Sequence, residues 1–393
     1  MSEVKESTEN GILTIHLSGR ISSSNAAEIE KRINDLRDSS GCELSVIDCE
    51  DLEYISSAGL RIILRLRKEF PSLKIINVSS DVYEIFDMTG FTEMMEIKKA
   101  YRRFSIEGCE IIGRGSNGEV YRIDDDTIIK VYKKADALPE IQKERELARK
   151  AFILGIPTAI PYDVVRVGDS YGSVFELLNH KSFSKLIAAE PENIDRYISL
   201  FVDLLKKIHS VELKPGEMPD MKETALSWAA FLKDYLPQEI HEKLVSLISD
   251  VPSSYRLLHG DYHTKNVLMQ NGEVLLIDMD TLCLGDPVFE FGSIYNAYVG
   301  FSELDHSVTQ SFLGIPWETA QYFWDKTVRL YFDTDDESRI SDIKIKAEII
   351  GQTRIMRRSI RRLSGTEFGE KQIECSRRHL IELVPKTGSL LLN

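Results

Sequence analysis

The first hundred residues alternate between short apolar runs and amphipathic segments. Strands are predicted at residues 12–17, 43–48 and 73–78, where β-branched and apolar side chains dominate. Apolar residues at helical spacing predict helices between them, the later two at 60–66 and 81–88. We expect Asn25 to cap the first helix, with Glu28 at the third position after it. Strands that alternate with helices over so short a stretch indicate a small α/β domain.

From about residue 107 onward, the pattern is first rich in strands and then helical. Strand-like runs occur within 112–123 and at 127–132, 171–178 and 274–277. Helices are predicted at 140–154 and 198–209, within 222–250, and beyond residue 300. This order predicts a strand-rich region that precedes a larger helical one.

The composition fits a globular protein of two or three domains. Apolar residues make up 42% and charged residues 28% of the 393 residues. The net charge of −14 argues against general binding to nucleic acid or anionic membranes. No apolar run approaches the ~20 residues that span a bilayer, and the polar N-terminus does not resemble a signal peptide. The five scattered cysteines are expected to be reduced thiols rather than a disulfide frame or zinc site, which predicts a cytoplasmic protein.

Residues 259–266 are the most informative segment, because they have the form H-x-D-x-x-x-x-N. This pattern is typical of catalytic loops in phosphoryl-transfer enzymes. Asp261 could accept the proton of an attacking hydroxyl, and Asn266 could bind a metal ion from the same loop. Asp278 ends an apolar run and offers a second metal ligand. The alternative is an ordinary polar surface loop.

Upstream, the pattern G-x-G-x-x-G-x-V lies between two strand-like runs. Its members are Gly113, Gly115, Gly118 and Val120, with Ser116 after the second glycine. The following strand carries Lys130 among apolar residues, where a charge requires a partner. Glycines allow the backbone to approach phosphates, and a strand lysine can bind them. A dinucleotide-binding fingerprint would open a helix after its glycines, whereas this pattern continues into a strand.

Two short segments resemble the signatures of the STAS domain, which occurs in anti-sigma factor antagonists and in the cytosolic tails of sulphate transporters. They are Tyr-Ile-Ser-Ser-Ala-Gly-Leu at 54–60 and Phe-Asp-Met-Thr-Gly-Phe at 86–91. The resemblance implies a protein partner and a phosphorylated switch at Ser57, where a helix N-terminus would favour the added phosphate. The family often has Asp immediately before that serine, and here the residue is Ser56. Alternatively, Ser56 or Ser57 only caps the helix.

The segments H-G-D-x-H-x-x-N, I-D and G-D-P resemble the pattern of the aminoglycoside phosphotransferase and choline kinase superfamily. The matching residues are His259, Gly260, Asp261, His263, Asn266, Asp278 and Asp286. Protein kinases typically carry H-R-D, D-F-G and A-P-E, and this chain has no A-P-E. The resemblance implies ATP and Mg²⁺ as cofactors, with Asn266 and Asp278 holding the metal. It also implies that His259 orients the loop and that Asp286 is structural.

The same resemblance implies further nucleotide contacts. Residues 143–147 loosely match the pattern R-E-a-E-a-L, which favours Glu144 as the partner of Lys130, with Glu146 as the alternative. Residues 171–178 resemble the hinge at which adenine bonds to the backbone. The contacts expected there come from Glu176 and Leu178.

Near the C-terminus lies a basic run with an apolar stripe. The run comprises Arg354, Arg357, Arg358, Arg361 and Arg362, and the stripe comprises Met356, Ile360 and Leu363. This pattern predicts a docked amphipathic helix with a solvated basic face. A site for an anionic substrate or a partner is the alternative.

Together these patterns predict an α/β STAS domain followed by an α+β bilobal, protein kinase-like phosphotransferase domain. The expected divisions are 1–98 for the STAS domain, 99–106 for a linker, 107–180 for a strand-rich N-lobe and 181–393 for a helical C-lobe. The expected function is transfer of the γ-phosphoryl group of ATP to a hydroxyl of a small molecule. The alternatives are a signalling kinase that phosphorylates protein serine, including Ser57, and a nucleotide-sensing scaffold without turnover.

Overall fold

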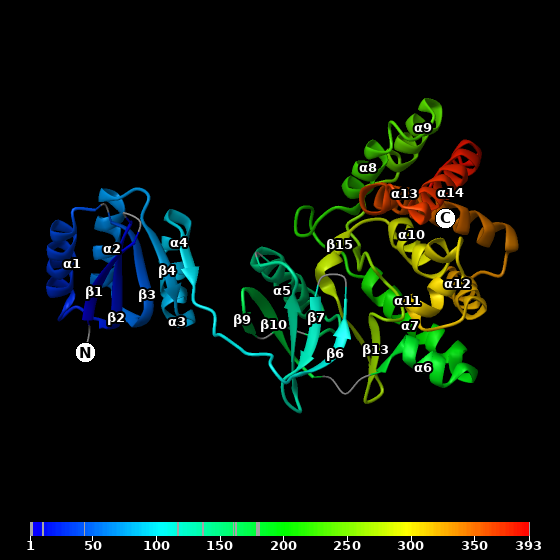
Figure 1. The fold of residues 1–393 in the computed structure, drawn as a ribbon. Coiled ribbons are helices and arrows are strands. Elements are labelled where there is room, and N and C mark those ends of the chain that lie inside the picture. The colour runs from blue at the N-terminus through cyan, green and yellow to red at the C-terminus, as the bar shows by residue number, and fades with distance from the viewer. Residues whose placement is uncertain are drawn as a thin grey trace. The chain divides into compact units, whose positions relative to one another are not determined.

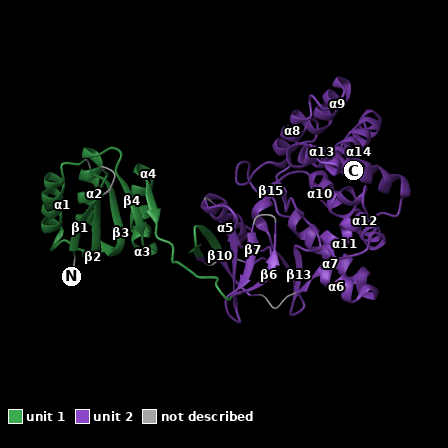
Figure 2. Ribbon diagram, viewed as in Figure 1, with its two compact units in different colours: residues 1–108, 164–172 green, residues 109–163, 173–393 purple. Residues whose placement is uncertain are grey.

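The computed structural model describes residues 3–9, 12–42, 44–115, 118–135, 137–159, 161, 163–177 and 181–392. Contacts divide the chain into two compact units (Figures 1 and 2). The first comprises Met1–Gly108 and Val164–Gly172, and the second comprises Cys109–Asp163 and Ser173–Asn393. Each unit has a hydrophobic core of its own.

The first unit is built on a five-stranded sheet in the order β1-β2-β3-β4-β5. The strands are β1 (Glu3–Glu9), β2 (Ile12–Ile21), β3 (Leu44–Ile55), β4 (Lys74–Val78) and β5 (Ile97–Lys99). β1 pairs antiparallel with β2, and the other neighbours are parallel. Parallel neighbours require crossover connections. Helices provide them: α1 (Ala26–Ser40), α2 (Ser57–Glu69) and α3 (Ser80–Met88), followed by the short α4 (Phe91–Met94).

The predicted strands and helices of this unit are present, and the differences lie at their ends. α2 begins at Ser57, before the predicted start at residue 60. Asn25 is the residue before α1, but its side chain makes no hydrogen bond to the helix, so the predicted cap is wrong. Its Oδ1 instead accepts from the N–H of Ser22 at 2.8 Å. β1 has no counterpart among the predicted elements, because Val4 is its only apolar residue.

A second five-stranded sheet has the order β6-β7-β8-β10-β9. The strands are β6 (Glu110–Arg114), β7 (Gly118–Arg122), β8 (Thr127–Tyr132), β9 (Asp163–Val167) and β10 (Ser170–Glu176), with α5 (Leu138–Ile153) between β8 and β9 in the sequence. Gly118 permits the close approach of β7 to β8, because a Cβ there would lie 2.2 Å from the carbonyl oxygen of Val131.

The segment after β5 runs beside β9. The N–H of Phe104 donates to the carbonyl of Arg166 at 2.8 Å, and the N–H of Arg166 donates to the carbonyl of Arg102 at 2.9 Å. These bonds form a parallel bridge between Arg103 and Arg166. They explain why residues 164–172 group with the first unit.

The rest of the second unit is mainly helical. Its helices are α6 (Phe183–Ala189), α7 (Ile194–His209), α8 (Met221–Phe231), α9 (Gln238–Ser249), α10 (Pro287–Tyr298), α11 (Ser307–Leu313), α12 (Trp317–Phe332), α13 (Glu337–Leu363) and α14 (Glu367–Leu383). Short 3₁₀ helices are η1 (Pro191–Asn193), η2 (Met279–Thr281), η3 (Gly300–Ser302) and η4 (Val384–Lys386). None of the helices in the described ranges combines the length and apolar character that crossing a membrane requires.

Two small antiparallel sheets carry the segments around residues 259–266. One contains β11 (Lys181–Ser182), β13 (Val267–Gln270) and β14 (Glu273–Leu276), and the other pairs β12 (Leu257–Leu258) with β15 (Cys283–Leu284). The aromatic core lies directly against this loop, because Tyr262 belongs to both. Its hydroxyl donates to the carbonyl of Phe201 at 2.7 Å, and the two ring centroids are 4.3 Å apart.

Candidate active site

Lys130 lies in β8, and its ammonium bonds to a carboxylate of α5. Nζ is 2.8 Å from Oε1 of Glu144, and the hydroxyl of Tyr132 donates to the other oxygen of that carboxylate. Glu144 is only 6% exposed. Glu146 is half a turn further along α5, where it pairs with Lys150 at 2.9 Å. The structure therefore pairs Lys130 with Glu144 and not with Glu146.

Asp278 reaches the same lysine from a second element. It follows β14, and its Oδ1 is 3.2 Å from Nζ of Lys130. Its φ of 67° lies in the left-handed region, at the point where the chain turns into η2. Burial alone would lower the pKa of Lys130, but attraction to Asp278 and Glu144 outweighs burial and raises this pKa above its ordinary value. The ammonium is therefore a fixed positive charge.

Asp280 adds another carboxylate to this group, and the sequence analysis missed it. Burial, followed by repulsion from Asp278 and Glu144, raises the pKa of Asp280 to about 7. Two carboxylates thus bond to the single ammonium of Lys130, and the third, of Asp280, interacts with all three groups electrostatically, which leaves an excess of negative charge. The spacing of two acids around Met279 was the signal in the sequence.

Glu290 holds the loop 259–266 from within the core, and the sequence analysis did not identify it. This residue lies on α10 and is fully buried. Its two oxygens accept from the N–H groups of His259 at 2.6 Å and Gly260 at 3.0 Å. Gly260 has a φ of +81°, and a Cβ there would lie 2.5 Å from the carbonyl oxygen of Thr281. One acid within the apolar helix was the available signal, since a buried charge needs partners.

His259 and Asn266 connect this loop to the chain that carries Asp278. The N–H of Asp261 donates to Nδ1 of His259 at 3.2 Å, which assigns the proton to Nε2, and Nε2 donates to the carbonyl of Ile277 at 3.1 Å. Nδ2 of Asn266 donates to the carbonyl of Asp261 at 3.0 Å. The carbonyl of Asn266 accepts from the N–H of Ile277 at 3.0 Å. The bonds bring Asp261, Asn266 and Asp278 into one region.

The carboxylate of Asp261 faces His263 and Arg354. Its oxygens are 3.5 Å from Nε2 of His263 and 3.8 Å from Nη2 of Arg354. Burial favours the neutral acid, but the hydrogen bond and charge of His263, followed by Arg354, keep the pKa of Asp261 below its ordinary value. Arg354 is itself held by the carbonyl of Gly260 at 3.0 Å and the hydroxyl of Ser293 at 2.9 Å. Asp261 is therefore an ionised carboxylate, and its side chain is 40% exposed.

The glycine-rich turn connects β6 to β7. The N–H of Gly115 donates to the carbonyl of Gly118 at 2.9 Å. Gly113 pairs with Val120 across the first ladder, and Val120 pairs with Lys130 across the next. The turn is therefore tied through two strands to the lysine that bonds to Glu144.

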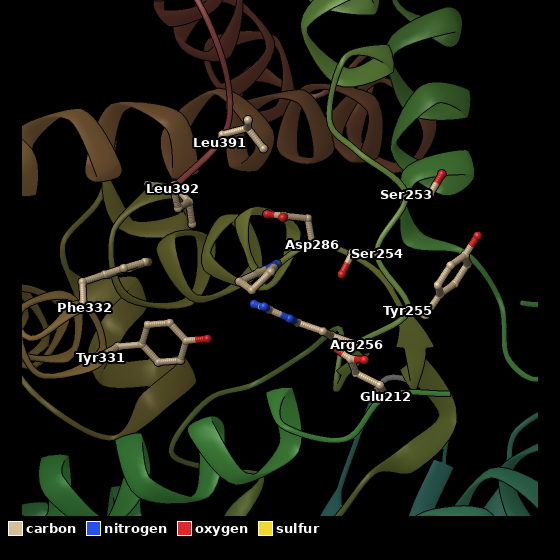
Figure 3. A pocket seen from close by; sticks show the side chains of 11 residues that line it. Glu212, Ser253, Ser254, Tyr255, Arg256, Asp286, Tyr331, Phe332, Leu391 and Leu392 are labelled. Carbon is tan, nitrogen blue, oxygen red and sulfur yellow. The ribbon is translucent and has the colours of Figure 1, made fainter. Parts of the chain in front are cut away.

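The remaining predicted residues add little to the geometry of the site. Glu176 ends β10 with an exposed side chain, whereas Ser116 and Leu178 lie outside the described residues. Asp286 is the N-cap of α10, where its side chain accepts from the N–H of Val288 at 2.9 Å. It also borders a cavity of about 440 Å³ that none of the predicted catalytic or cofactor residues lines (Figure 3). The other lining residues are Glu212, Ser253, Ser254, Tyr255, Arg256, Pro287, Tyr331, Phe332, Leu391 and Leu392.

Ser57 is the first residue of α2, and its side chain is exposed. The cap is made by Ser56, whose side chain accepts from the N–H of Gly59 at 3.5 Å. Gly59 is needed for close packing, because a Cβ there would lie 2.6 Å from Ile55 and 2.7 Å from Ile21. Ser57 is therefore free of the capping role and accessible at a helix N-terminus.

The family model described as "Phosphotransferase enzyme family" matches residues 108–318, which is more than half of the chain. The chain belongs to the phosphotransferase enzyme family. The N-terminal part of the chain is a STAS domain, since the STAS model matches residues 4–103. This part is 33% identical over 92 residues to the putative anti-sigma factor antagonist BtrV of Bordetella bronchiseptica. The match covers 22% of this phosphotransferase and 78% of that relative.

Among solved structures, aminoglycoside phosphotransferases are similar to this chain. The apo form of a thermostable mutant of APH(4)-Ia is 13% identical, with a TM-score of 0.48, covering 72% of this phosphotransferase and 95% of that chain. ADP-bound APH(2'')-Ib is 15% identical, with a TM-score of 0.49, covering 77% and 98%. The family matches and the architecture together confirm the predicted fold class, an α/β STAS domain followed by a kinase-like α+β phosphotransferase domain.

Proposed function

We propose that this phosphotransferase transfers the γ-phosphoryl group of ATP, with Mg²⁺, to a hydroxyl of a small molecule. The observation that carries the proposal is the connected set of bonds that runs from Lys130 through Asp278 to the loop of Asp261 and Asn266. Such a set supplies a phosphate-binding charge, metal ligands and a hydroxyl-orienting carboxylate, which are the groups that phosphoryl transfer uses.

Asp261 would accept a hydrogen bond from the acceptor hydroxyl and then take its proton. Because the pKa of Asp261 is below its ordinary value, this carboxylate is a weak base that stays ionised. Its main contribution is therefore to orient the hydroxyl toward the phosphorus, with proton transfer late in the reaction. His259 keeps the loop in register through its two ring nitrogens.

The nucleotide would lie against the strand-rich sheet. Lys130, positioned by Glu144, would bind the α- and β-phosphates, and the turn of Gly113, Gly115 and Gly118 would cover them. Val120 would pack against the nucleotide from β7, opposite Lys130. Further contacts with the nucleotide would come from Ser116, Glu176 and Leu178.

The residues around Asp278 fit a magnesium ion. Mg²⁺ prefers oxygen ligands, and Asp278, Asn266 and Asp280 offer carboxylate and amide oxygens. Burial first, and then repulsion from Asp278 and Glu144, raises the pKa of Asp280, and a bound dication would offset both effects. When bound, the ion supplies positive charge that screens the phosphates from the attacking oxygen.

The acceptor side carries an excess of positive charge. Arg354, Arg357 and Arg358 lie on α13, and Arg354 bonds to the catalytic loop. Burial, followed by repulsion from Arg362 and Arg354, lowers the pKa of Arg358, whereas Asp261 opposes this change. Such mutual repulsion favours an acceptor that carries an anionic group over a polycationic one.

The metal assignment is tested by calorimetric titration of ATP with and without Mg²⁺. We expect Asp278→Ala to lose most of the magnesium-dependent affinity and Asp280→Asn to lose part of it. Asp286→Asn is the matched control, because that residue caps a helix and lies outside the proposed ligand set. Equal ATP affinity with and without Mg²⁺ in the unsubstituted protein would contradict the assignment.

The acceptor class is tested by measuring ADP release with panels of anionic, neutral and cationic hydroxyl compounds. We expect turnover with hydroxyl compounds that carry phosphate or carboxylate groups. Turnover restricted to polycationic acceptors would contradict the charge argument while leaving the phosphotransferase assignment intact.

A second candidate function is phosphorylation of a protein serine, specifically Ser57 of a STAS domain. It is favoured by the exposure of Ser57 at the start of α2, where unpaired helix N–H groups stabilise a phosphate. A phosphate adds about −1.5 to −2 charges, which would change the surface that the STAS domain offers to a protein partner.

This alternative is tested by mass spectrometry after incubation with Mg²⁺-ATP. Phosphate should appear on the peptide of Ser57 in the unsubstituted protein and not in Ser57→Ala or Asp261→Asn. No phosphate at Ser57, together with turnover on a small molecule, would favour the metabolite kinase with an unmodified STAS domain.

A further inference from the structure

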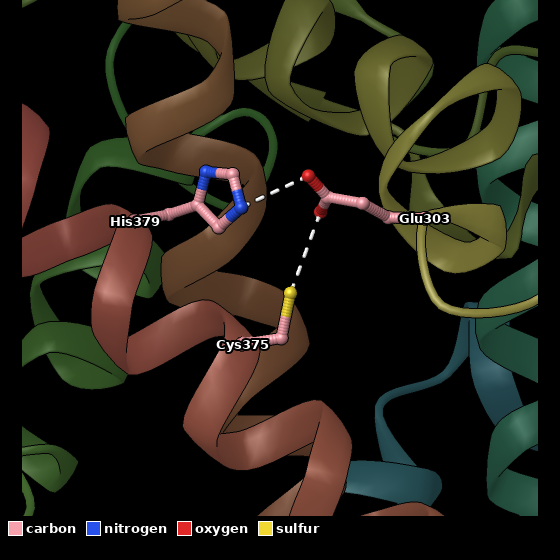
Figure 4. Close-up of side chains that lie close together, drawn as sticks. All are labelled: Glu303, Cys375 and His379. Atoms are coloured by element: carbon pink, nitrogen blue, oxygen red, sulfur yellow. Dashed lines mark hydrogen bonds and ion pairs between the residues drawn. The ribbon is translucent and has the colours of Figure 1, made fainter.

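A cluster of metal-binding side-chain types, Glu303, Cys375 and His379, lies between α14 and the segment after η3 (Figure 4). Cys375 and His379 are one helical turn apart on α14, so they lie on one face of that helix. Glu303 follows η3. Its Oε1 is 2.9 Å from Nε2 of His379, and its Oε2 is 3.8 Å from Sγ of Cys375. One ligand atom of each residue lies within 4.8 Å of the others.

Two residues of α13 orient this cluster. Oε1 of Glu348 is 2.5 Å from Nδ1 of His379, and Nε2 of Gln352 donates to Oε2 of Glu303 at 3.0 Å. A carboxylate on the far nitrogen of a histidine is the arrangement that orients many metal-binding imidazoles. It leaves Nε2 of His379 on the side of Glu303 and Cys375.

The Nε2 atom of His379 is buried and makes no hydrogen bond of adequate geometry among the described residues, although a carboxylate oxygen is near. Cys375 is 5% exposed and brings a thiol to the same place. The imidazole of His379 thus lies between two carboxylates, those of Glu303 and Glu348.

We infer that Glu303, Cys375 and His379 bind a zinc ion, with water in the fourth position and Glu348 orienting the imidazole. Thiolate, imidazole and carboxylate together suit Zn²⁺, whereas Mg²⁺ takes oxygen ligands. Bond lengths of about 2.0–2.3 Å place ligand atoms roughly 3–4 Å apart, close to the spacing present here. Binding requires a thiolate and an unprotonated Nε2 on the imidazole, so any proton on these two atoms is released to solvent.

Such an ion would join α14 to the segment after η3. The ion would also stiffen α13, because this helix carries Glu348. The same helix carries Arg354, which contacts the catalytic loop. The inference does not depend on the identity of the acceptor. The five cysteines are free thiols, as expected, and the inference adds a metal-binding role for Cys375 alone. One cysteine and one histidine at helical spacing show no zinc pattern until Glu303 is placed beside them.

Cobalt substitution of the full chain tests the site, because a thiolate ligand to Co²⁺ produces a charge-transfer band. We expect this band in the unsubstituted protein and stoichiometric zinc after dialysis against a weak chelator. Cys375→Ser and His379→Gln should lose both. Cys283→Ser is the matched control, because Cys283 is also buried in this unit and lies outside the cluster.

Glu348→Gln sharpens the test, because it keeps all three ligands. We expect zinc affinity to fall by about 10–100-fold, as for other outer partners of ligating histidines. A cobalt-loaded unsubstituted protein without the charge-transfer band would overturn the site, and it would do so even where a variant fails to fold. Equal zinc content in the unsubstituted protein and in correctly folded His379→Gln would overturn it too.

Discussion

The two sides of the proposed active site carry opposite excesses of charge. On the nucleotide side, the carboxylates of Glu144 and Asp278 bond to the single ammonium of Lys130, and Asp280 adds a further carboxyl group whose pKa is raised. On the acceptor side, Arg354 of α13 lies 3.8 Å from the single carboxylate of Asp261, whose pKa is lowered by His263 and then by Arg354, and Arg357 and Arg358 lie on the same helix. Each side thus lacks the opposite charge that its proposed ligand, a dication or an anionic acceptor, would bring.

The two sides also differ in what holds them in place. The nucleotide side is assembled from side-chain ion pairs between β8, α5 and the segment after β14. The acceptor side is assembled from hydrogen bonds to backbone atoms of the loop 259–266. Two N–H groups of the loop donate to the buried Glu290, and one carbonyl of the loop accepts from Arg354. Substitutions on the nucleotide side should therefore change binding, whereas those on the acceptor side should change the geometry and rate of transfer.

The largest expected effect comes from Asp261→Asn. This change removes the carboxylate that orients the hydroxyl but keeps the shape of the loop. We expect kcat to fall by about 10²–10⁴-fold, with ATP affinity unchanged by calorimetry. Full turnover in this variant would contradict a role for Asp261 in the reaction. Weakened ATP binding would contradict the claim that substitutions on the acceptor side leave nucleotide binding unchanged.

Lys130→Met should have the second largest effect, because it leaves three carboxylates without the ammonium that balances part of their charge. Loss of one preorganised charge at the phosphates should lower kcat/KM for ATP by about 10²–10³-fold. Glu144→Gln should produce a smaller loss in the same direction. Glu146→Gln is its matched control, since Glu146 pairs with Lys150 on the solvent side of α5, and its kinetics should match those of the unsubstituted protein.

Much of this nucleotide side could be predicted from the sequence, and less of the acceptor side could. Lys130 and Asp278 were recognisable because a charge inside, or at the end of, an apolar run requires a partner. Glu144 was chosen by its resemblance to a family pattern. Glu290 was not recognised, because nothing in the sequence of an apolar helix shows which distant backbone amides it will meet. Arg354 was recognised only as part of a basic face, since its contact with Gly260 spans two elements far apart in the sequence.

Arg358→Ala should have a more modest effect. It removes one positive charge from the acceptor side without touching the loop, so KM for an anionic acceptor should rise by about tenfold while kcat and KM for ATP change little. Arg362→Ala, on the same helix and exposed, serves as the control. An equal change in both variants would indicate general attraction rather than a specific contact.

The smallest expected effect concerns pH. The lowered pKa of Asp261 depends first on His263, so His263→Gln should raise this pKa by roughly one unit. The acid limb of kcat/KM should then move to higher pH by the same amount. A carboxyl group whose pKa is lower in the folded than in the unfolded protein stabilises the fold at pH values above its ordinary pKa. This contribution is lost as the pH falls. Unfolding measured between about pH 5 and pH 3 should therefore show a shallower decline in this variant than in the unsubstituted protein.

The bridge between residues 102–104 and β9 has a consequence for any attempt to separate the two domains. β9 is the outer strand of its sheet, and the bridge occupies the N–H and the carbonyl of Arg166. A phosphotransferase fragment that begins at residue 109 would leave this edge open to pairing with another molecule, which is a common route to aggregation. A fragment that begins before Tyr101 would retain its own edge protection and should remain dispersed at higher concentration.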